Sequence, residues 1–423
     1  MSGFIIKGDI CSSSDQNTIH VWPNGYLVCE DGLSRGVFTE IPGRYQGLQL
    51  LDFTGKLVIP GMTDLHVHAP QFSFRGLGMD MELLDWLNTY TFPEEAKYRD
   101  LTYAARAYHA FAAHLHRSTT TRACVFATIH VPATELLMQE LDETGICSYV
   151  GKVNMNRNSP DYLCEASVEQ ALADTELWIC RTRERFLHTK PILTPRFIPS
   201  CSDGLLHGLH TLQEKYHLPV QSHLSENFGE IAWVKELCPN SKFYGDAYDQ
   251  FGLFGGDNPC IMAHCVHSGH EETELMRKNG VFIAHSPESN MNLASGVAPV
   301  RRFLEEGLHV GLATDVAGGS SESMLRAIMH AIQASKLRWR LFDETTRPLS
   351  FEQAFYLATA GGGAFFGSVG KFEDGYAMDA VVLDDSTLDH PQELCVRDRL
   401  ERSIYLADDR HICAKFVEGR RVL

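Results

Sequence analysis

The sequence predicts an α/β protein, a (β/α)8 TIM-like barrel with a small β-sandwich domain formed from both chain ends. Eight short apolar, β-prone runs alternate with longer helix-like stretches through the middle of the chain, as expected for successive βα units. The two ends of the chain have a different sequence pattern, in which short apolar runs are separated by the turn-forming residues Gly, Asn and Asp. At 423 residues, with 44% hydrophobic and 22% charged residues, the chain is long enough to bury both units.

Both ends of the chain read as β-rich. The first fifty-odd residues contain FIIKGD, VWPNGYLVCEDG and LQLLDFTGK, and the last fifty contain KFEDGYAMDAVVLDD and RSIYLADDRHICAKFVEGRRVL. Residues 1–57 plus 370–423 are therefore predicted to form one composite domain. Residues 58–369 are predicted to form the barrel.

The barrel prediction depends on eight strand candidates in chain order. They are Leu57–His66, Thr120–Thr128, Ser148–Met155, Pro191–Phe197, Pro219–His223, Pro259–Cys265, Val281–His285 and His309–Asp315. Helical patterns such as Glu272–Lys278 and Ser323–Ala334 lie between or after them.

Composition excludes several classes of partner. There are 37 basic and 54 acidic residues, a net charge of -17, and the basic residues form no patch, so neither nucleic acid nor an anionic membrane is expected to bind. The 12 cysteines have no CxxC spacing, and MSGFIIKGD is not a secretory leader. No apolar run is long enough to span a membrane. These features predict a soluble protein of the reducing cytoplasm.

The candidate site consists of polar residues at the ends of predicted barrel strands, where barrel enzymes place their chemistry. His66 and His68 end the first strand, and their spacing of two puts both imidazoles on one face. His223 ends the fifth strand, His264 the sixth and Asp315 the eighth. Together they predict a metal site.

Neutral imidazole and carboxylate ligands suit Zn²⁺, although iron and manganese also fit. Zinc would activate water at neutral pH, and a second group must then move protons to the leaving group. Glu226, three residues after His223, is the predicted proton shuttle. Asp315 would bind the metal and hold the water, and His264 would polarise the attacked group or orient the water.

Longer motifs carry a resemblance to a known family. The segment PGMTDLHVHAPQFSFRGLGMDMELLDWLNTYTFPEE and the blocks FATIH, GKVNMN, TPRFIPSCS, QSHLSEN, MAHC, HSPESNMNLASG and ATDVAGGSSESML occur in family order from about Leu57 to Leu325. The chain thereby resembles the amidohydrolase superfamily and, within it, the guanine deaminases. The HxH and TD motifs indicate only the superfamily. The blocks that narrow the resemblance to the guanine deaminases are APQ, DWLNTYTFPEE, TPRF and TDVAGG.

The resemblance implies zinc-dependent hydrolysis of guanine to xanthine and ammonia, with one Zn²⁺ per chain and a homodimer. The residues that match the family's metal ligands are His66, His68, His223 and Asp315. Gln71 and Arg196, with the adjoining Phe197, match residues that bind the base. The resemblance also places His223, Glu226 and His264 beside the substrate. Guanine's adjacent O6 and N7 acceptors suit the forked donors of an arginine.

Two alternatives stay open at this point. One is another deaminase or dechlorinase of the same superfamily, acting on an 8-oxopurine or a triazine. Gln71 and Arg196, the residues that match guanine-binding side chains, would distinguish a guanine deaminase from such an enzyme. The other is a non-catalytic barrel that binds a partner protein.

Two further expectations concern the walls of the site. Glu288 in HSPESN is either an ordinary variant or an additional carboxylate near the mouth that alters affinity or the pH profile. Either one of the aromatic residues of the first loop stacks on the base, or all of them pack a lid helix against the barrel; these are Phe72, Phe74, Trp86 and Phe92.

Overall fold

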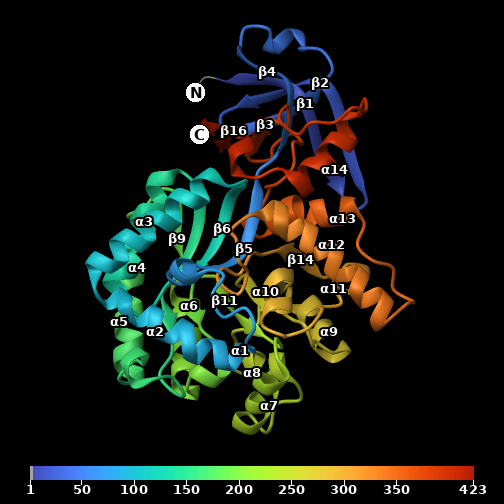
Figure 1. Cartoon of the computed structure of the whole chain (residues 1–423). Helices are drawn as coiled ribbons and strands as arrows, with labels where there is room; N and C mark the ends of the chain where they lie inside the picture. Colours follow the sequence, from blue (N-terminus) through green and yellow to red (C-terminus); the bar gives the residue numbers. More distant parts are fainter. Residues whose placement is uncertain (1–2) are drawn as a thin grey trace.

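The computed structural model describes residues 3–423 and gathers both ends of the chain in one seven-stranded sheet. The strand order is β17-β16-β15-β4-β1-β2-β3. The strands are β1 (Phe4–Asp15), β2 (Thr18–Glu30), β3 (Leu33–Phe38), β4 (Gln49–Pro60), β15 (Ala380–Leu383), β16 (Ile412–Val417) and β17 (Arg420–Arg421). Figure 1 shows this small sheet, built from strands near both ends of the chain, above the strands of the middle of the chain.

The middle of the chain forms parallel strands with a helix after most of them. One four-stranded sheet has the order β5-β6-β7-β9, a second has the order β11-β12-β13-β14, and β10 pairs with β8. Their bounds are β5 (Met62–His68), β6 (Thr120–Phe126), β7 (Cys147–Gly151), β8 (Val153–Asn154), β9 (Thr189–Pro191), β10 (Thr194–Pro195), β11 (Val220–Leu224), β12 (Cys260–His264), β13 (Phe282–His285) and β14 (His309–Leu312).

Backbone hydrogen bonds join the two four-stranded sheets at both edges. On one side, Gln221 N donates to Leu193 O at 2.9 Å. On the other, Asp315 N donates to His66 O at 2.9 Å, and His68 N donates to Val316 O at 3.1 Å. The last of these strands is thereby brought against the first, an arrangement of the TIM-barrel type.

Helices surround these strands (Figure 1). They are α1 (Leu83–Trp86), α2 (Phe92–Glu95), α3 (Leu101–Arg117), α4 (Val131–Thr144), α5 (Val168–Thr182), α6 (Asp203–Tyr216), α7 (Phe228–Leu237), α8 (Tyr244–Gln250), α9 (His270–Asn279), α10 (Pro287–Asn292), α11 (Val300–Glu305), α12 (Met324–Leu341), α13 (Phe351–Tyr356) and α14 (Val396–Leu406). Two of them confirm the helices predicted at Glu272–Lys278 and Ser323–Ala334. In the described part of the chain, none of these helices combines the length and the apolar character that a membrane crossing needs.

The first predicted strand, Leu57–His66, was wrong in its bounds. The apolar run is divided at Gly61: the residues before it end β4 of the small sheet, and those after it begin β5. A Cβ at Gly61 would lie 2.2 Å from Thr121 Oγ1, so only glycine allows this close passage between sheets. The fourth predicted strand, Pro191–Phe197, is likewise divided, into β9 and β10.

Candidate active site

Three strand ends bring the predicted metal-binding residues to one point. His66 and His68 alternate along β5, whose residues are all buried, so both rings face the interior. His223 lies near the end of β11, and Asp315 follows β14 by three residues. Asp315 has a positive φ of 48°. Residues other than glycine rarely adopt this backbone conformation, and those that do are concentrated at functional sites.

The ligand atoms of these four residues converge. His68 Nε2 lies 3.2 Å from His66 Nε2 and 3.3 Å from His223 Nε2. Asp315 Oδ1 lies 3.2 Å from His66 Nε2 and 3.5 Å from His68 Nε2. All four side chains are buried or nearly so.

The electrostatics of the cluster fit a cation. Burial lowers the pKa of His66, His68 and His223, so their rings are neutral at pH 7. His223 Nδ1 donates to the carbonyl oxygen of Arg196 at 2.6 Å, which leaves the lone pair on Nε2 facing the cluster. Burial opposes ionisation of Asp315, yet the facing histidines hold the pKa of its carboxyl well below the usual range. Converging lone pairs and a carboxylate are what a divalent ion would hold together.

A second cluster of potential ligands is different. Cys147, His188 and Glu418 also lie near one another. Arg122 Nη2 donates to Glu418 Oε1 at 3.3 Å, and Arg420 Nη2 lies 3.1 Å from His188 Nδ1. Burial raises the pKa of the Cys147 thiol to about 12. Arginines already contact the glutamate and the histidine, and the thiol stays protonated at neutral pH, so this group offers no comparable cation site.

Glu226 and His264 lie beside the converging ligands. Glu226 is 3% exposed, its Oε1 accepts from Ser295 Oγ at 3.0 Å, and its Oε2 lies 3.4 Å from His264 Nε2. Burial, with the nearby Glu230 carboxylate, raises the pKa of Glu226 to about 7 even though His264 opposes the shift. A carboxyl group that titrates near neutral pH can both accept and donate a proton.

Two residues outside the sequence-predicted set hold these groups in place. Asn290 Oδ1 lies 2.9 Å from His264 Nδ1 and thereby fixes the ring. Asp64 accepts hydrogen bonds from the backbone of His66 at 3.2 Å and of Thr314 at 3.0 Å, which ties β5 to the segment that carries Asp315. Both lie within quoted motifs, but nothing in their spacing distinguishes them from ordinary polar residues.

Gln71 and Arg196 face the same pocket, and both are held by a residue that the sequence prediction missed. Glu95 Oε2 accepts from Arg196 Nη1 at 2.5 Å, and its Oε1 accepts from Arg196 Nη2 and from Gln71 Nε2, each at 3.1 Å. Gln71 Oε1 accepts from the backbone N–H of Ala317 at 3.2 Å. The only sequence signal for Glu95 is its place at the end of the TFPEE block.

The apolar walls of the pocket come partly from the predicted aromatic residues. Trp86 and Phe197 line the pocket, and the Phe92 ring lies 5.2 Å from the Arg196 guanidinium carbon. Phe74 packs on Trp86, and Phe72 packs on α3 instead of lining the pocket. Trp86 and Phe197 are therefore the rings available to a flat ligand.

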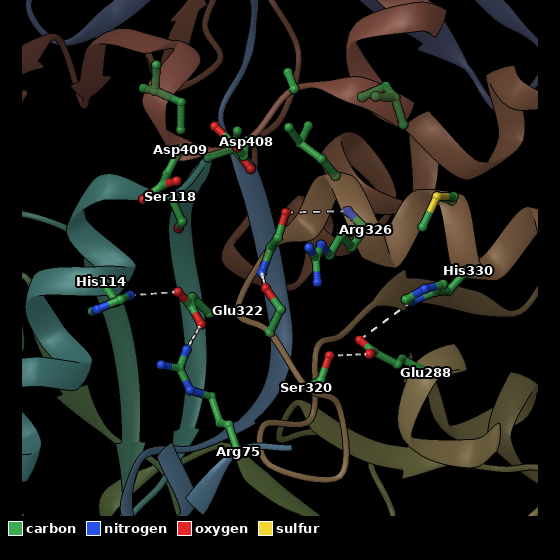
Figure 2. Close-up of a pocket in the computed structure, with 18 of the residues that line it drawn as sticks. Arg75, His114, Ser118, Glu288, Ser320, Glu322, Arg326, His330, Asp408 and Asp409 are labelled. Carbon is green, nitrogen blue, oxygen red and sulfur yellow. Dashed lines mark hydrogen bonds and ion pairs between the residues drawn. The ribbon is translucent and has the colours of Figure 1, made fainter. Parts of the chain in front are cut away.

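The expectation that Glu288 lies near the mouth was wrong. Glu288 lines a separate, polar cavity of about 800 Å³ between α3, α12 and the end of α14. There it accepts from Ser320 and lies 3.5 Å from His330 Nδ1, while Arg75 pairs with Glu322 on the opposite side (Figure 2). The short helix α10 carries Asn290 toward His264 and directs Glu288, two residues earlier, away from it.

Comparisons with known proteins agree with this geometry. Residues 57–422 match the model of the amidohydrolase family. The chain belongs to the amidohydrolase family. It is 34% identical to guanine deaminase of Dictyostelium discoideum over 99% of this chain and 98% of that protein, and 35% identical to that of Escherichia coli over 89% and 85%. The crystal structure of guanine deaminase from C. acetobutylicum with bound guanine in the active site is 46% identical, with a TM-score of 0.97 over the whole of both chains. The predicted family membership is thereby confirmed.

Proposed function

We propose that this protein hydrolyses guanine to xanthine and ammonia with one Zn²⁺ per chain. The observation that carries the proposal is that Arg196 and Gln71 face the same pocket as the converging histidines and Asp315. The full-length similarity to a guanine-bound structure supports the same substrate.

His66, His68, His223 and Asp315 are the residues that would hold the metal. Their neutral rings and single carboxylate suit zinc, and iron or manganese would also be accepted by this donor set. A divalent ion bound there supplies the Lewis acidity that activates water at neutral pH.

The remaining residues orient the base. The free N–H groups of Arg196 match the O6 and N7 acceptors of guanine, whose amino-bearing carbon lies on the opposite edge of the ring system. Gln71 retains one amide hydrogen and one oxygen lone pair for a second polar edge. Phe197 and Trp86 supply apolar surface for the ring faces.

The reaction requires movement of both protons of a water molecule. Its oxygen bonds to C2 of guanine, one proton goes to the ring nitrogen N3, and the other goes to the amine, which leaves as ammonia when the C–N bond breaks. Glu226 carries the first of these protons, and Asp315 accepts the second before it reaches the amine. His264, held by Asn290 and 3.4 Å from Glu226, stabilises the charge that develops on the attacked group.

Several broader assignments remain part of the proposal. We expect a (β/α)8 barrel of residues 58–369 and a β-sandwich domain of residues 1–57 plus 370–423. The 12 cysteines, all of which are free in the structure, support the expected location in the reducing cytoplasm. A homodimer is expected from the family resemblance.

The experiment that tests the function is ammonia release by the zinc-loaded protein from guanine, 8-oxoguanine, adenine, guanosine, cytosine and melamine. Release from guanine with xanthine formed in equal amount is the expected result. Release from another ring alone would keep the hydrolytic site and overturn the roles of Gln71 and Arg196. No release from any compound by the metal-loaded protein would favour a binding protein.

A further inference from the structure

The buried carboxylate of Glu95 lies behind the pocket rather than in its lining. We propose that Glu95 is a positioning residue that determines the charge selectivity of the base-binding pocket: it holds Arg196 and Gln71 in place and cancels the charge of Arg196, so that the pocket selects a neutral purine base over an anionic one. This inference rests on the proposed function.

The contacts of Glu95 fix the orientation of both base-binding side chains. Glu95 is 1% exposed, and its two oxygens receive two parallel N–H donors of Arg196. This bidentate geometry sets the plane and rotation of the guanidinium. The Gln71 amide is fixed as well, since a carboxylate only accepts and the backbone N–H of Ala317 only donates. If the nitrogen and oxygen of the Gln71 amide exchanged places, both hydrogen bonds would be lost.

The same contacts set the net charge of this wall. Arg196 is 3% exposed, and the ion pair with Glu95 is its only salt bridge in the described part of the chain. The guanidinium therefore presents directed donors to the pocket without an unbalanced positive charge. Donors of this kind match the neutral O6 and N7 edge of guanine. A bare guanidinium in a buried pocket would instead favour a carboxylate, a phosphate or an ionised base.

The neighbouring Glu94 provides a matched control. It lies on the same short helix and is 7% exposed, but its carboxylate binds Tyr103 and Lys97 and touches neither Arg196 nor Gln71. Substituting either glutamate by glutamine removes one buried carboxylate from α2. Only the change at Glu95 leaves Arg196 without a counter-charge.

The test compares wild type, Glu95→Gln, Glu95→Asp and Glu94→Gln as zinc-loaded proteins. The measurements are kcat and KM for guanine and the inhibition constant of xanthine at mildly alkaline pH, where xanthine is largely a monoanion and guanine is neutral. Hypoxanthine, which keeps the O6 and N7 edge and is neutral, serves as a second inhibitor. Melting temperature and zinc content are recorded for each protein.

For Glu95→Gln we expect a rise of at least tenfold in KM for guanine and in the inhibition constant of hypoxanthine, with kcat changed less than threefold. The inhibition constant of the xanthine anion should stay constant or fall. Glu95→Asp keeps the charge with a shorter reach, so it should raise KM and both inhibition constants by one common factor. In Glu94→Gln the ratios among KM for guanine and the two inhibition constants should be those of wild type.

The inference would be overturned if Glu95→Gln changed the inhibition constants of neutral hypoxanthine and anionic xanthine by the same factor. A loss of kcat without a change in KM would overturn it too. If Glu95→Gln does not fold, a wild-type KM in Glu95→Asp would overturn it as well. Failure of the proposed function looks different, because the wild-type protein would then release no ammonia from guanine.

Discussion

Replacing Glu226 by glutamine isolates proton transfer from the other functions of the site. Glutamine has nearly the same shape, and its amide oxygen can still accept the hydrogen bond from Ser295 Oγ. The Glu226 side chain makes no hydrogen bond, in the described structure, to any of the four converging residues that would hold the metal. The variant should therefore fold and bind zinc as wild type does while lacking a group that exchanges protons.

The expected loss of kcat lies at the upper end of the range for general acid–base catalysis, about 10³- to 10⁴-fold. At 1.36 kcal/mol per factor of ten, this corresponds to about 4–5 kcal/mol of activation free energy. The upper end is expected because the neighbouring Glu230 carboxylate already accepts hydrogen bonds from Tyr244 and from the backbone N–H of Glu226. It cannot take over the transfer.

The assay is steady-state ammonia release, with metal content and thermal unfolding measured on the same preparation. Above pH 7 the variant should melt at the wild-type temperature or higher, because burial makes the ionised Glu226 carboxylate unfavourable in the folded state. Glu272→Gln is the control: this carboxylate is also buried but binds Ser225 and the backbone of Gly245 instead of the site. A kcat within tenfold of wild type in zinc-loaded Glu226→Gln would refute the shuttle assignment.

The same residue predicts the acidic limb of the pH profile. Glu226 must be ionised to accept the first proton, and its pKa is raised to about 7. Consequently kcat/KM should fall with decreasing pH below about 7, approaching tenfold per pH unit. This limb should be absent from the residual activity of Glu226→Gln, and a profile that is flat in wild type down to pH 5 would contradict the assignment.

Three further substitutions test other parts of the site. Asp315→Ala removes the only carboxylate of the converging cluster, so zinc content and activity should both be lost, and full metal occupancy would contradict its role. Arg196→Lys keeps the charge but loses the fork, and kcat/KM for guanine should fall about 5- to 150-fold, the equivalent of about 1–3 kcal/mol for a bidentate contact to a base. Glu288→Gln should leave kcat/KM for guanine within about twofold, because Glu288 faces the separate cavity; a larger change would show that the two cavities communicate.

The sequence was sufficient to predict the residues that lie at strand ends. His66 and His68 could be found because alternation along a strand places both on one face, and His223, His264 and Asp315 because parallel strands end at a common edge. Strand bounds were less predictable. The run from Leu57 to His66 contains the Pro60-Gly61 dipeptide, which signals a break. That the chain changes sheets there depends on the close passage of Thr121, which is distant in sequence.

The supporting contacts could not be predicted from the sequence because they join segments that only the fold brings together. Glu95 is 101 residues from Arg196, and Asp64 is 250 residues from Thr314. A glutamate at the end of a short helix has no pattern that separates a solvated acid from a buried counter-ion. Its role depends on the depth at which α2 packs over the strand ends, and this depth is set by tertiary contacts.

Glu95 also connects the proposed specificity with the overall charge of the protein. With 54 acidic and 37 basic residues, the field of the protein repels anions before they reach the site. Long-range repulsion is screened beyond about 10 Å at moderate salt, so it slows the approach of an anion without excluding it from a pocket. Exclusion at contact requires that the wall of the pocket that binds the base offer no unbalanced positive charge. The ion pair of Glu95 with Arg196 meets this requirement, whereas an unpaired arginine would attract guanine nucleotides and ionised bases despite the negative surface. Selection of the neutral base thus depends on a residue that does not line the pocket.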